Sequence, residues 1–234
     1  MVISYPASPS GPISDHASSE DAKQRKGLGP RVRKLHARIG KAHYQAEGMA
    51  FSKALLAGEA TSLQLAALLR SLAPAYRFIE EEAPALALAL GARSMPWLDL
   101  ARTNALEHDL KKLSCLADTP VSASAAIWLQ QLRLLARQSP HRLMAHVYVR
   151  YGGDLSGGQQ LAIQADAILE QNGLPALDFW VFKRPTAELK ISLHDAFEEL
   201  ELNQFEELEL LEEAEIAFQA TQRLLAELDD LTPL

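Results

Sequence analysis

Apolar residues recur at three- and four-residue spacing along most of the chain after residue 30, a pattern typical of amphipathic helices. Thr61, a residue type that caps helices, precedes a broad apolar face that runs from Leu65 to Tyr76. No segment alternates apolar and polar residues over the length of a strand, and β-branched residues are scarce. The pattern therefore predicts an all-α protein.

Proline, glycine and capping residues predict where these helices begin and end. Gly40 and Gly48 are expected to mark bends, Pro74 to kink a helix, and an apolar plug from Phe179 to Phe182 to lie in a connection. The first helix is expected from about residue 30 through His43, with a second stretch to Leu56. The other expected helices cover residues 61–82, with 84–90 as a short continuation, then 97–117, 122–139, 140–172, 186–202 and 204–231.

Length and composition favour one folded domain. The chain has 234 residues, of which 48% are apolar, and this is enough for one substantial core. Residues 1–30 are rich in proline and serine and are expected to form a disordered N-terminal tail. Residues 31–234 are expected to form the domain.

Charge and cysteine content exclude some classes of protein. The net charge of −7 disfavours nonspecific nucleic-acid binding, which needs a basic surface. The chain has neither an apolar run of about 18 residues nor a secretory signal, so no membrane anchor is expected. The single cysteine, Cys115, excludes an intramolecular disulfide and is expected to be a small buried residue. We expect a soluble, cytoplasmic monomer.

Four glycines, Gly152, Gly153, Gly157 and Gly158, interrupt the helix predicted over residues 140–172. Each glycine inside a helix costs about 1 kcal/mol relative to alanine. A helix without Cβ atoms along one strip can bend and can lie against a flat ligand, and Gly153 and Gly157 share such a face. Spacing alone leaves two alternatives open, a loop between two helices and a tight helix crossing.

Arg150 and Asp154 lie on the helix face next to this strip, four residues apart. A guanidinium and a carboxylate at this border can hold an ordered water or a polar diatomic molecule, or can form a structural ion pair. His43 and Glu47 have the same spacing in the first helix, which lets the carboxylate orient the imidazole. A lone histidine is more often an ordinary helix residue, so spacing alone leaves metal ligation open.

The segment from Ala145 to Gln159 (AHVYVRYGGDLSGGQ) closely resembles the distal-helix signature of the haem oxygenases. The segment from Ala42 to Glu47 (AHYQAE) resembles their proximal-histidine motif, and the resemblance extends from about Leu35 to about Leu228. It implies a soluble, bacterial-type, single-domain helical bundle that holds haem b between a proximal and a kinked distal helix. The implied reaction converts haem, which is both substrate and cofactor, to biliverdin, CO and ferrous iron with O₂ and external electrons, for bilin biosynthesis or iron release.

The resemblance assigns roles to individual residues. It implies that His43, with Glu47 beside it, holds the haem iron, and that Gly153 and Gly157 bring the distal helix close, with Gly158 adding freedom to bend. Asp154 matches the family aspartate that anchors distal water and directs oxygen activation toward the porphyrin. Tyr76 and Arg150 match members of its hydrogen-bond network; the alternative is a core tyrosine and a structural ion pair.

The haem propionates need polar partners at the pocket edge. Tyr148 matches a family tyrosine that reaches a propionate, and the cations expected nearby are Arg38, Lys41 and Lys190. The chain also departs from the family pattern, and these departures imply altered tuning of haem seating. Ser192 and Ala196 stand where relatives have Lys and Arg, Thr221 where they have Asn, and Gly152 where they have Leu.

Other histidines are weaker candidates for the iron ligand. His146 matches a family histidine that does not bind iron, and it lies two turns from the glycines. His36, seven residues before His43, makes a bis-histidine metal site possible but poorly motivated. No useful second-ligand spacing accompanies His108, His141 and His194.

The chain has no flavin- or nicotinamide-binding fingerprint, so its electrons are expected from a ferredoxin or an NAD(P)H-dependent reductase. An acidic donor is expected to dock on the basic rim formed by residues 31–41. Two other functions stay open. One is a haem-binding protein that stores, transfers or senses haem without degrading it, and the other is a helical interaction protein that does not bind haem.

Overall fold

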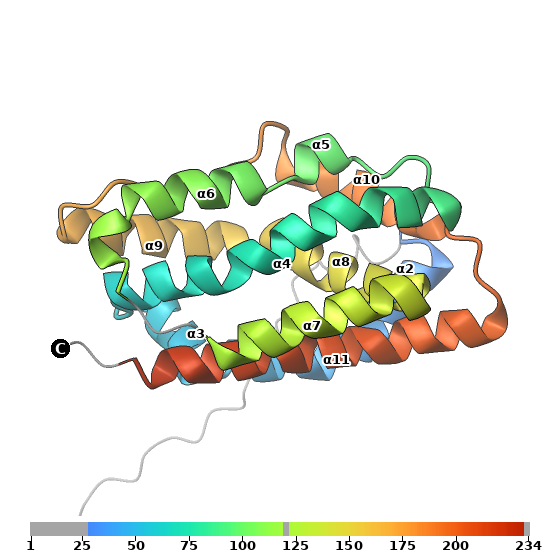
Figure 1. The fold of residues 1–234 in the computed structure, drawn as a ribbon, viewed down its shortest axis with the longest axis horizontal. Helices are drawn as coiled ribbons and strands as arrows, with labels where there is room; N and C mark the ends of the chain where they lie inside the picture. The colour runs from blue at the N-terminus through green and yellow to red at the C-terminus, as the bar shows by residue number, and fades with distance from the viewer. Residues whose placement is uncertain (1–27, 119–121, 232–234) are drawn as a thin grey trace, which may run out of the picture.

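The computed structural model describes residues 28–118 and 122–231, and within them the chain is helical and contains no strand (Figure 1). The all-α prediction is confirmed. The predicted tail lies outside the described residues as far as residue 27. The helices are α2 (Pro30–Glu47), α3 (Ala50–Leu56), α4 (Ser62–Ala89), α5 (Trp97–Leu100), α6 (Thr103–Lys112), the short 3₁₀ helix η1 (Ser114–Leu116), α7 (Ala123–Gln138), α8 (Pro140–Asp154), α9 (Gly158–Gln171), α10 (Thr186–Glu198) and α11 (Gln204–Asp229).

Helix α8 is the buried centre of the bundle. It packs against α4, α7, α9, α10 and α11, and every residue from Leu143 to Val149 is buried. A helix that is buried around its whole circumference needs apolar residues on all sides, which this segment largely supplies. Because α8 is central, its C-terminal residues Arg150 and Asp154 lie inside the protein and not on its surface.

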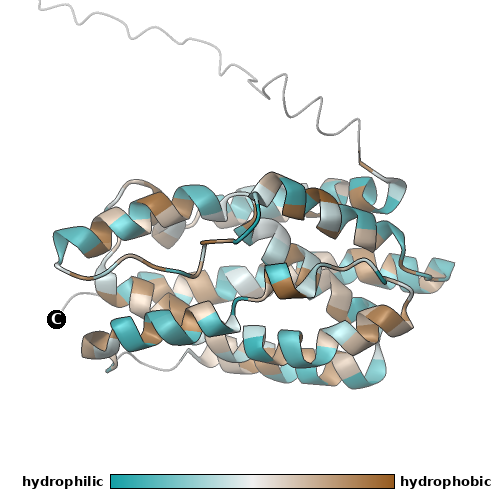
Figure 2. Cartoon of the chain, turned by 90° about the horizontal axis from the view of Figure 1, so that it is seen from above, coloured by the Kyte–Doolittle hydropathy of each residue, from teal (hydrophilic) through white to brown (hydrophobic). Residues whose placement is uncertain are grey.

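Hydrophilic and hydrophobic residues are mixed along the surrounding helices, as expected for amphipathic helices around one core (Figure 2). A carboxylate links α10 to the start of α2. Glu198, the last residue of α10, accepts a hydrogen bond from the backbone N–H of Val32 at 2.8 Å. An anion at a helix N-terminus satisfies unpaired N–H groups, so α10 holds the start of α2 in place.

Helix α4 runs through two prolines. Thr61 caps it with a capping box, as expected, and the helix continues through Pro74 and Pro84, so residues 84–89 extend it as the predicted short continuation. A proline inside a helix costs about 3 kcal/mol. Ala83 and Ala87 are fully buried on either side of Pro84, and this packing holds the helix together.

The single helix predicted over residues 97–117 is wrong. The structure divides it into α5, α6 and η1, with Ala101 in an extended conformation between the first two. The cause is Arg102, whose buried guanidinium turns inward and donates through Nε to the carbonyl oxygen of Leu100 at 3.0 Å. Since Cys115 consequently lies in η1 and not on a buried helix face, it is exposed, and the prediction of burial is also wrong.

The predictions for the two glycines of the first helix have different outcomes. Gly40 lies inside the continuous helix α2 and does not end it, whereas Gly48 caps the C-terminus of that helix. The helix predicted over residues 186–202 ends at Glu198. Among the described residues, no helix is long and apolar enough to cross a membrane.

Candidate active site

A cavity lies among α2, α3, α4, α8, α9 and α11, and it encloses about 1190 Å³ of space between atoms, its open mouth included. Most of its lining is apolar, with Phe51 and leucines from α3, α4 and α11. Polar groups come from His43 on α2, from Arg150 and Asp154 on α8, and from α11. A large apolar pocket with a few convergent polar groups is the usual form of a small-molecule site.

His43 lies at the wall of this cavity that α2 provides. Its side chain is 52% exposed, and its Nδ1 lies 3.6 Å from Oε1 of Glu47 one turn later, as their spacing predicted. The ring of Phe218 meets the imidazole edge-on, with 5.8 Å between ring centroids. With the carboxylate on the Nδ1 side, Nε2 is the ring nitrogen left for a ligand.

The glycine-rich segment breaks the helix expected over residues 140–172 into two, which agrees with the kinked distal helix implied by the resemblance and with the alternative of a loop between two helices. Helix α8 ends at Asp154 and α9 begins at Gly158. Within the turn, the N–H of Ser156 donates to the carbonyl oxygen of Gly153 at 3.1 Å, a spacing of three residues that tightens the chain. We call the residues from Gly153 to Gly158 the glycine turn.

The cavity side of the glycine turn is bare. A Cβ atom built on Gly153 or on Gly157 would meet no heavy atom within 4 Å, and both residues line the cavity. A tight helix crossing would place atoms of another helix at these positions, so that alternative is excluded for them. Gly153 and Gly157 therefore leave room in the cavity for a ligand to contact the backbone directly.

Gly158 lines the cavity, as expected, and it also makes room for a neighbouring side chain. A Cβ atom there would lie 2.8 Å from Cδ1 of Trp180, so this glycine is required for the indole to pack against the turn. Trp180 itself lines the cavity. Gly152, by contrast, has no neighbour within 4 Å of a built Cβ atom and lies outside the cavity lining.

Asp154, Tyr76 and Arg150 form one buried network, as predicted. The hydroxyl of Tyr76 donates a short hydrogen bond to Oδ2 of Asp154, and Nε of Arg150 donates to the same hydroxyl oxygen at 3.3 Å. Nη2 of Arg150 lies 3.8 Å from Oδ1 of Asp154. Thr221 on α11 accepts a hydrogen bond from Nη1 of Arg150 at 3.4 Å. The network therefore joins α4, α8 and α11 at the cavity.

Burial decides the protonation of this network. It raises the pKa of Asp154 above its ordinary value, although the nearby Arg150 and the Tyr76 hydrogen bond act in the opposite direction. Burial also raises the pKa of Tyr76 well above its ordinary value, so the phenol keeps its proton and acts as a donor. A carboxyl group with increased proton affinity beside an open cavity is suited to proton transfer.

A second buried network, which the sequence analysis did not predict, lies behind the cavity wall. Trp128 lines the cavity and donates its indole N–H to Nδ1 of His146 at 3.1 Å. Nε2 of His146 lies 3.0 Å from Oε1 of Glu213, which is completely buried. Both ring nitrogens of His146 are thus occupied by protein groups, which agrees with its rejection as an iron ligand. An acidic residue on the apolar face of the last helix was the signal available for Glu213.

The structure does not bring the predicted propionate residues into the cavity lining. Tyr148 is 2% exposed and packs with its ring stacked on that of His194, whose Nε2 lies 3.5 Å from the tyrosine hydroxyl. Burial, with His36 and Lys190 nearby, lowers the pKa of His194 to about 4, so this histidine is neutral near pH 7. The contact between Tyr148 and a propionate stays a prediction.

The cations expected at the pocket edge are also outside the lining. Arg38 forms an ion pair with Glu215 at 3.0 Å, and Lys41 is exposed on α2. On α10, Ser192 donates to a backbone carbonyl of its own helix and Ala196 is fully buried. Neither position supplies the positive charge that the Lys and Arg of the family pattern would place there.

Comparison with known proteins gives a consistent result. The family model described as Heme oxygenase matches residues 32–227. Heme oxygenase of Rhodella violacea is 27% identical over 194 residues, which cover 81% of this chain and 83% of that protein. Heme oxygenase 1 of Nostoc sp. is 27% identical over 201 residues, which cover 84% of both chains.

Solved structures agree with the sequence matches. The crystal structure of heme oxygenase-1 from the cyanobacterium Synechocystis sp. PCC6803 in complex with heme superposes with a TM-score of 0.78 and 26% sequence identity. The match covers 86% of this chain and 93% of that chain. The heme oxygenase from Leptospira interrogans superposes with a TM-score of 0.75 at 27% identity, over 85% of this chain and 100% of that chain.

Proposed function

The chain belongs to the haem oxygenase family, and from this premise we propose that haem binds in the cavity between α2 and the glycine turn and is degraded there. The protein is a haem-binding enzyme that degrades haem to biliverdin, the activity of its family. The resemblance adds O₂ as co-substrate and CO and ferrous iron as the other products. The location of the reaction and the roles of individual residues are the proposal.

The residues of the cavity fit a flat, largely apolar ligand with a metal at its centre. The observation that carries the proposal is the bare face of Gly153 and Gly157, where no protein atom approaches within 4 Å of a built Cβ atom, in the same cavity as His43. Leucine, phenylalanine and tryptophan side chains supply most of the remaining apolar wall. A porphyrin matches each of these features.

We assign His43 as the iron ligand, through Nε2. Glu47 lies on the Nδ1 side of the ring, where a carboxylate fixes the orientation of the imidazole and increases its basicity as a ligand. His146, whose two ring nitrogens face Trp128 and Glu213, has no nitrogen left for this role. The half-exposed position of His43 leaves the imidazole accessible to a ligand that enters through the mouth.

Bound haem supplies the iron that activates O₂ and the porphyrin that is oxidised. The protein supplies controlled proton delivery. Tyr76 occupies Oδ2 of Asp154 with its hydrogen bond, whereas Oδ1 is 3.8 Å from Arg150, too far for a direct hydrogen bond. We propose that Oδ1 holds a water on the cavity side and passes protons through it, which delivers a proton more gradually than a strong acid in direct contact.

Electrons come from an external donor, a ferredoxin or an NAD(P)H-dependent reductase. The basic rim of residues 31–41 proposed as its docking site is partly neutralised, because Arg31 and Lys34 pair with Glu207. Arg33 and Lys41 remain exposed on α2 and would meet an acidic donor near the cavity. The proposed protein acts as a monomer in the cytoplasm, as expected from the sequence.

A turnover assay separates the enzyme from a haem carrier, the alternative favoured by Ser192 and Ala196 where the family has cations. With haem, O₂ and ascorbate or a reductase, we expect the Soret band to disappear while biliverdin absorbance rises. A Soret band that persists through many equivalents of reductant indicates a carrier. Absence of any Soret shift on adding haem indicates a protein that does not bind it.

His43→Ala tests the ligand assignment. We expect this variant to lose the spectrum of histidine-ligated haem and, with it, turnover. His36→Ala is the matched control, because His36 lies two turns earlier on the same helix and contacts the rings of Tyr148 and His194 instead. A His43→Ala protein with an unchanged histidine-ligated spectrum would contradict the assignment.

A further inference from the structure

One wall of the cavity comes from the connection between α9 and α10, which belongs to no helix. We call its segment from Asp178 to Val181 the strap. Phe179 and Trp180 in the strap are 0% and 4% exposed, and both line the cavity. The ring of Phe179 meets that of Tyr76 edge-on, with 5.5 Å between centroids. The strap therefore supports the tyrosine that donates to the catalytic carboxylate.

Two buried side chains from outside the cavity satisfy the backbone of the strap. The carboxylate of Asp109, which is completely buried, accepts the N–H groups of Asp178 at 2.9 Å and of Phe179 at 2.8 Å. Nη1 of Arg102 donates to the carbonyl oxygens of Phe179 at 3.2 Å and of Val181 at 2.6 Å. Because buried backbone groups outside helices need such partners, Asp109 and Arg102 fix where the strap lies.

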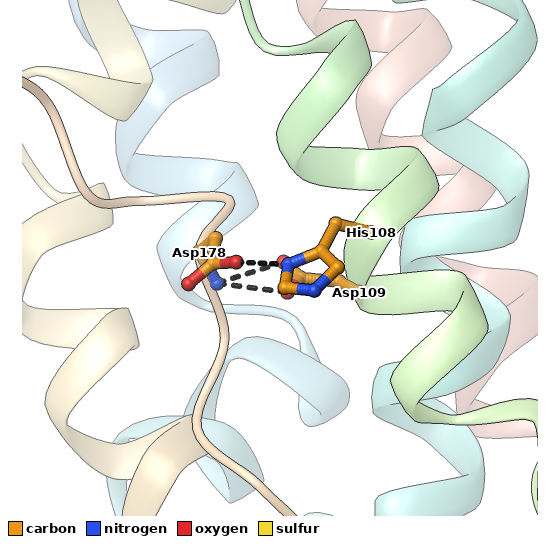
Figure 3. A group of neighbouring side chains, drawn as sticks. All are labelled: His108, Asp109 and Asp178. Atoms are coloured by element: carbon orange, nitrogen blue, oxygen red, sulfur yellow. Dashed lines mark hydrogen bonds and ion pairs between the residues drawn. The ribbon is translucent and has the colours of Figure 1, made fainter.

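Figure 3 shows Asp109 with His108 and Asp178, a group whose ligand atoms lie within 4.8 Å of one another and could surround a metal ion. The charges indicate a clamp instead. Nζ of Lys112 lies 3.1 Å from Oδ1 of Asp109 and 3.0 Å from Oδ2 of Asp178, so an ammonium already neutralises both carboxylates. Both oxygens of Asp109 also accept backbone N–H groups, which leaves them poorly placed to bind a cation.

The strap is also joined to the glycine turn. Nε2 of Gln159 donates to the carbonyl oxygens of Asp154 and Trp180, both at 3.1 Å. Trp180 packs against Gly158 closely enough that a Cβ atom there would lie 2.8 Å from the indole. A displaced strap would therefore move the turn and its carboxylate.

We propose that Asp109 and Arg102 are positioning residues for haem degradation. Through the strap they hold Tyr76 and the glycine turn in place, so that the space opposite His43 keeps the width that a porphyrin needs. Neither residue lines the cavity, so their effect on the substrate is indirect. The inference rests on the proposed haem site, and it goes further by assigning a role in the reaction to residues behind the cavity wall.

Hydrogen–deuterium exchange of the ligand-free protein tests the mechanical part. In Asp109→Ala, we expect the amides of residues 178 and 179 to exchange at least about 10-fold faster, because two buried N–H groups lose their acceptor. Exchange across residues 155–160 should increase too, while the amides of α11 keep their wild-type protection. Asp109→Asn, which keeps one acceptor oxygen, should show smaller changes in the same places and covers the case in which the alanine variant folds poorly.

Asp166→Ala is the matched control. The carboxylate of Asp166 accepts a hydrogen bond from the N–H of Leu177 at 2.9 Å, immediately before the strap. The substitution therefore removes the same kind of hydrogen bond from the same connection. We expect faster exchange at residue 177 and wild-type behaviour across residues 155–160. Equal effects of the two variants on residues 155–160 would contradict a specific role for Asp109.

Haem titration and product analysis test the link to the reaction. We expect haem dissociation constants about 10-fold higher in the Asp109 variants and unchanged in Asp166→Ala. Faster exchange confined to the strap, with residues 155–160, haem affinity and product as in the wild type, would overturn the positioning role. If the wild-type chain bound no haem, the proposed function would fail, while faster exchange across residues 155–160 in Asp109→Ala would still support positioning of the turn.

Discussion

The carboxyl group of Asp154 is held where its charged form is costly. It is 4% exposed, and burial raises its pKa against the opposing effects of Arg150 and Tyr76. A carboxyl group whose pKa is higher in the folded than in the unfolded chain stabilises the fold below its unfolded value of 3.8. That contribution is lost as the pH rises from 3.8 through the folded pKa, so the carboxyl group makes the protein less stable at neutral pH than in acid. Such a cost is typical of residues kept for chemistry.

Asp154→Asn should therefore trade activity for stability. We expect a higher melting temperature than the wild type at pH 7, because the amide keeps an acceptor for Tyr76 and carries no buried charge. The difference should shrink as the pH falls toward 3.8 and vanish well below it, where the wild-type carboxyl group is protonated in both the folded and the unfolded state. Turnover should fall by about 100-fold or more, as expected for loss of a proton-transfer group. A variant that is less stable than the wild type at pH 7 would contradict this account.

Gly153→Ala separates the needs of the ligand from those of the fold. No atom lies within 4 Å of the new methyl group, so we expect the ligand-free protein to be more stable by up to about 1 kcal/mol, the helix-propensity gain. Haem affinity should nevertheless fall by about 10-fold or more, because the methyl group occupies the face proposed to hold the porphyrin. Thermal denaturation and haem titration measure the two effects.

Gly152→Ala is the control, since it is also free of neighbours but lies outside the cavity lining. It should raise stability and leave haem binding unchanged. Gly158→Ala should lower the stability of the ligand-free protein, because its methyl group meets Trp180. Equal haem affinities for the Gly152 and Gly153 variants would mean that the bare face is not the porphyrin site.

At the scale of elements, periodicity predicted which segments are helical better than where they break. Residues 140–172 were expected to form one helix because apolar spacing continues on both sides of the glycines. The break depends on the tight turn at Ser156, which apolar spacing does not encode. The break after Leu100 depends on where the side chain of Arg102 turns, and that is decided by partners in the distant strap.

The same limit applies to the site. The pairs His43–Glu47 and Arg150–Asp154 each lie one helical turn apart, so their proximity could be predicted from spacing. Tyr76 came only from the family resemblance, since 78 residues separate it from Asp154. His146–Glu213 and the contacts of Asp109 also join distant segments, and no local pattern could reveal them.

Glu213 tests the buried network that joins α8 and α11. Burial raises the pKa of Glu213, but His146 and Arg142 together lower it by more, so the net pKa lies below the ordinary value. A carboxylate with a lowered folded pKa stabilises the fold above its unfolded value of 4.5, and the contribution is lost as the pH falls through the folded pKa. The network should therefore weaken only in acid.

Glu213→Ala should lower the free energy of unfolding by about 3 kcal/mol at pH 7, because it leaves the buried His146 and the partly exposed Arg142 without their carboxylate partner. Glu213→Gln, which keeps the shape and one acceptor oxygen, should cost less. Urea unfolding at several pH values measures both. The deficit of Glu213→Gln should diminish below pH 4.5, and a deficit that is constant down to acid pH would contradict the role of the charge.

At the scale of the whole molecule, the two sides of the cavity are held by different parts of the chain. The proximal side, α2, is fixed at its start by Glu198 of α10, and the distal side is fixed by the strap and by the buried centre of α8. Ser192 and Ala196 do not supply the cations that the family pattern led us to expect on α10. In the proposed site, enclosure by apolar walls and ligation by His43 would therefore contribute more of the haem affinity.

A crystal structure of the haem complex tests the central claim most directly. The account predicts iron bound to Nε2 of His43, with one porphyrin face against the backbone of Gly153 and Gly157 and a water between Asp154 and the metal. Haem bound through another residue, or located away from the glycine turn, would contradict it.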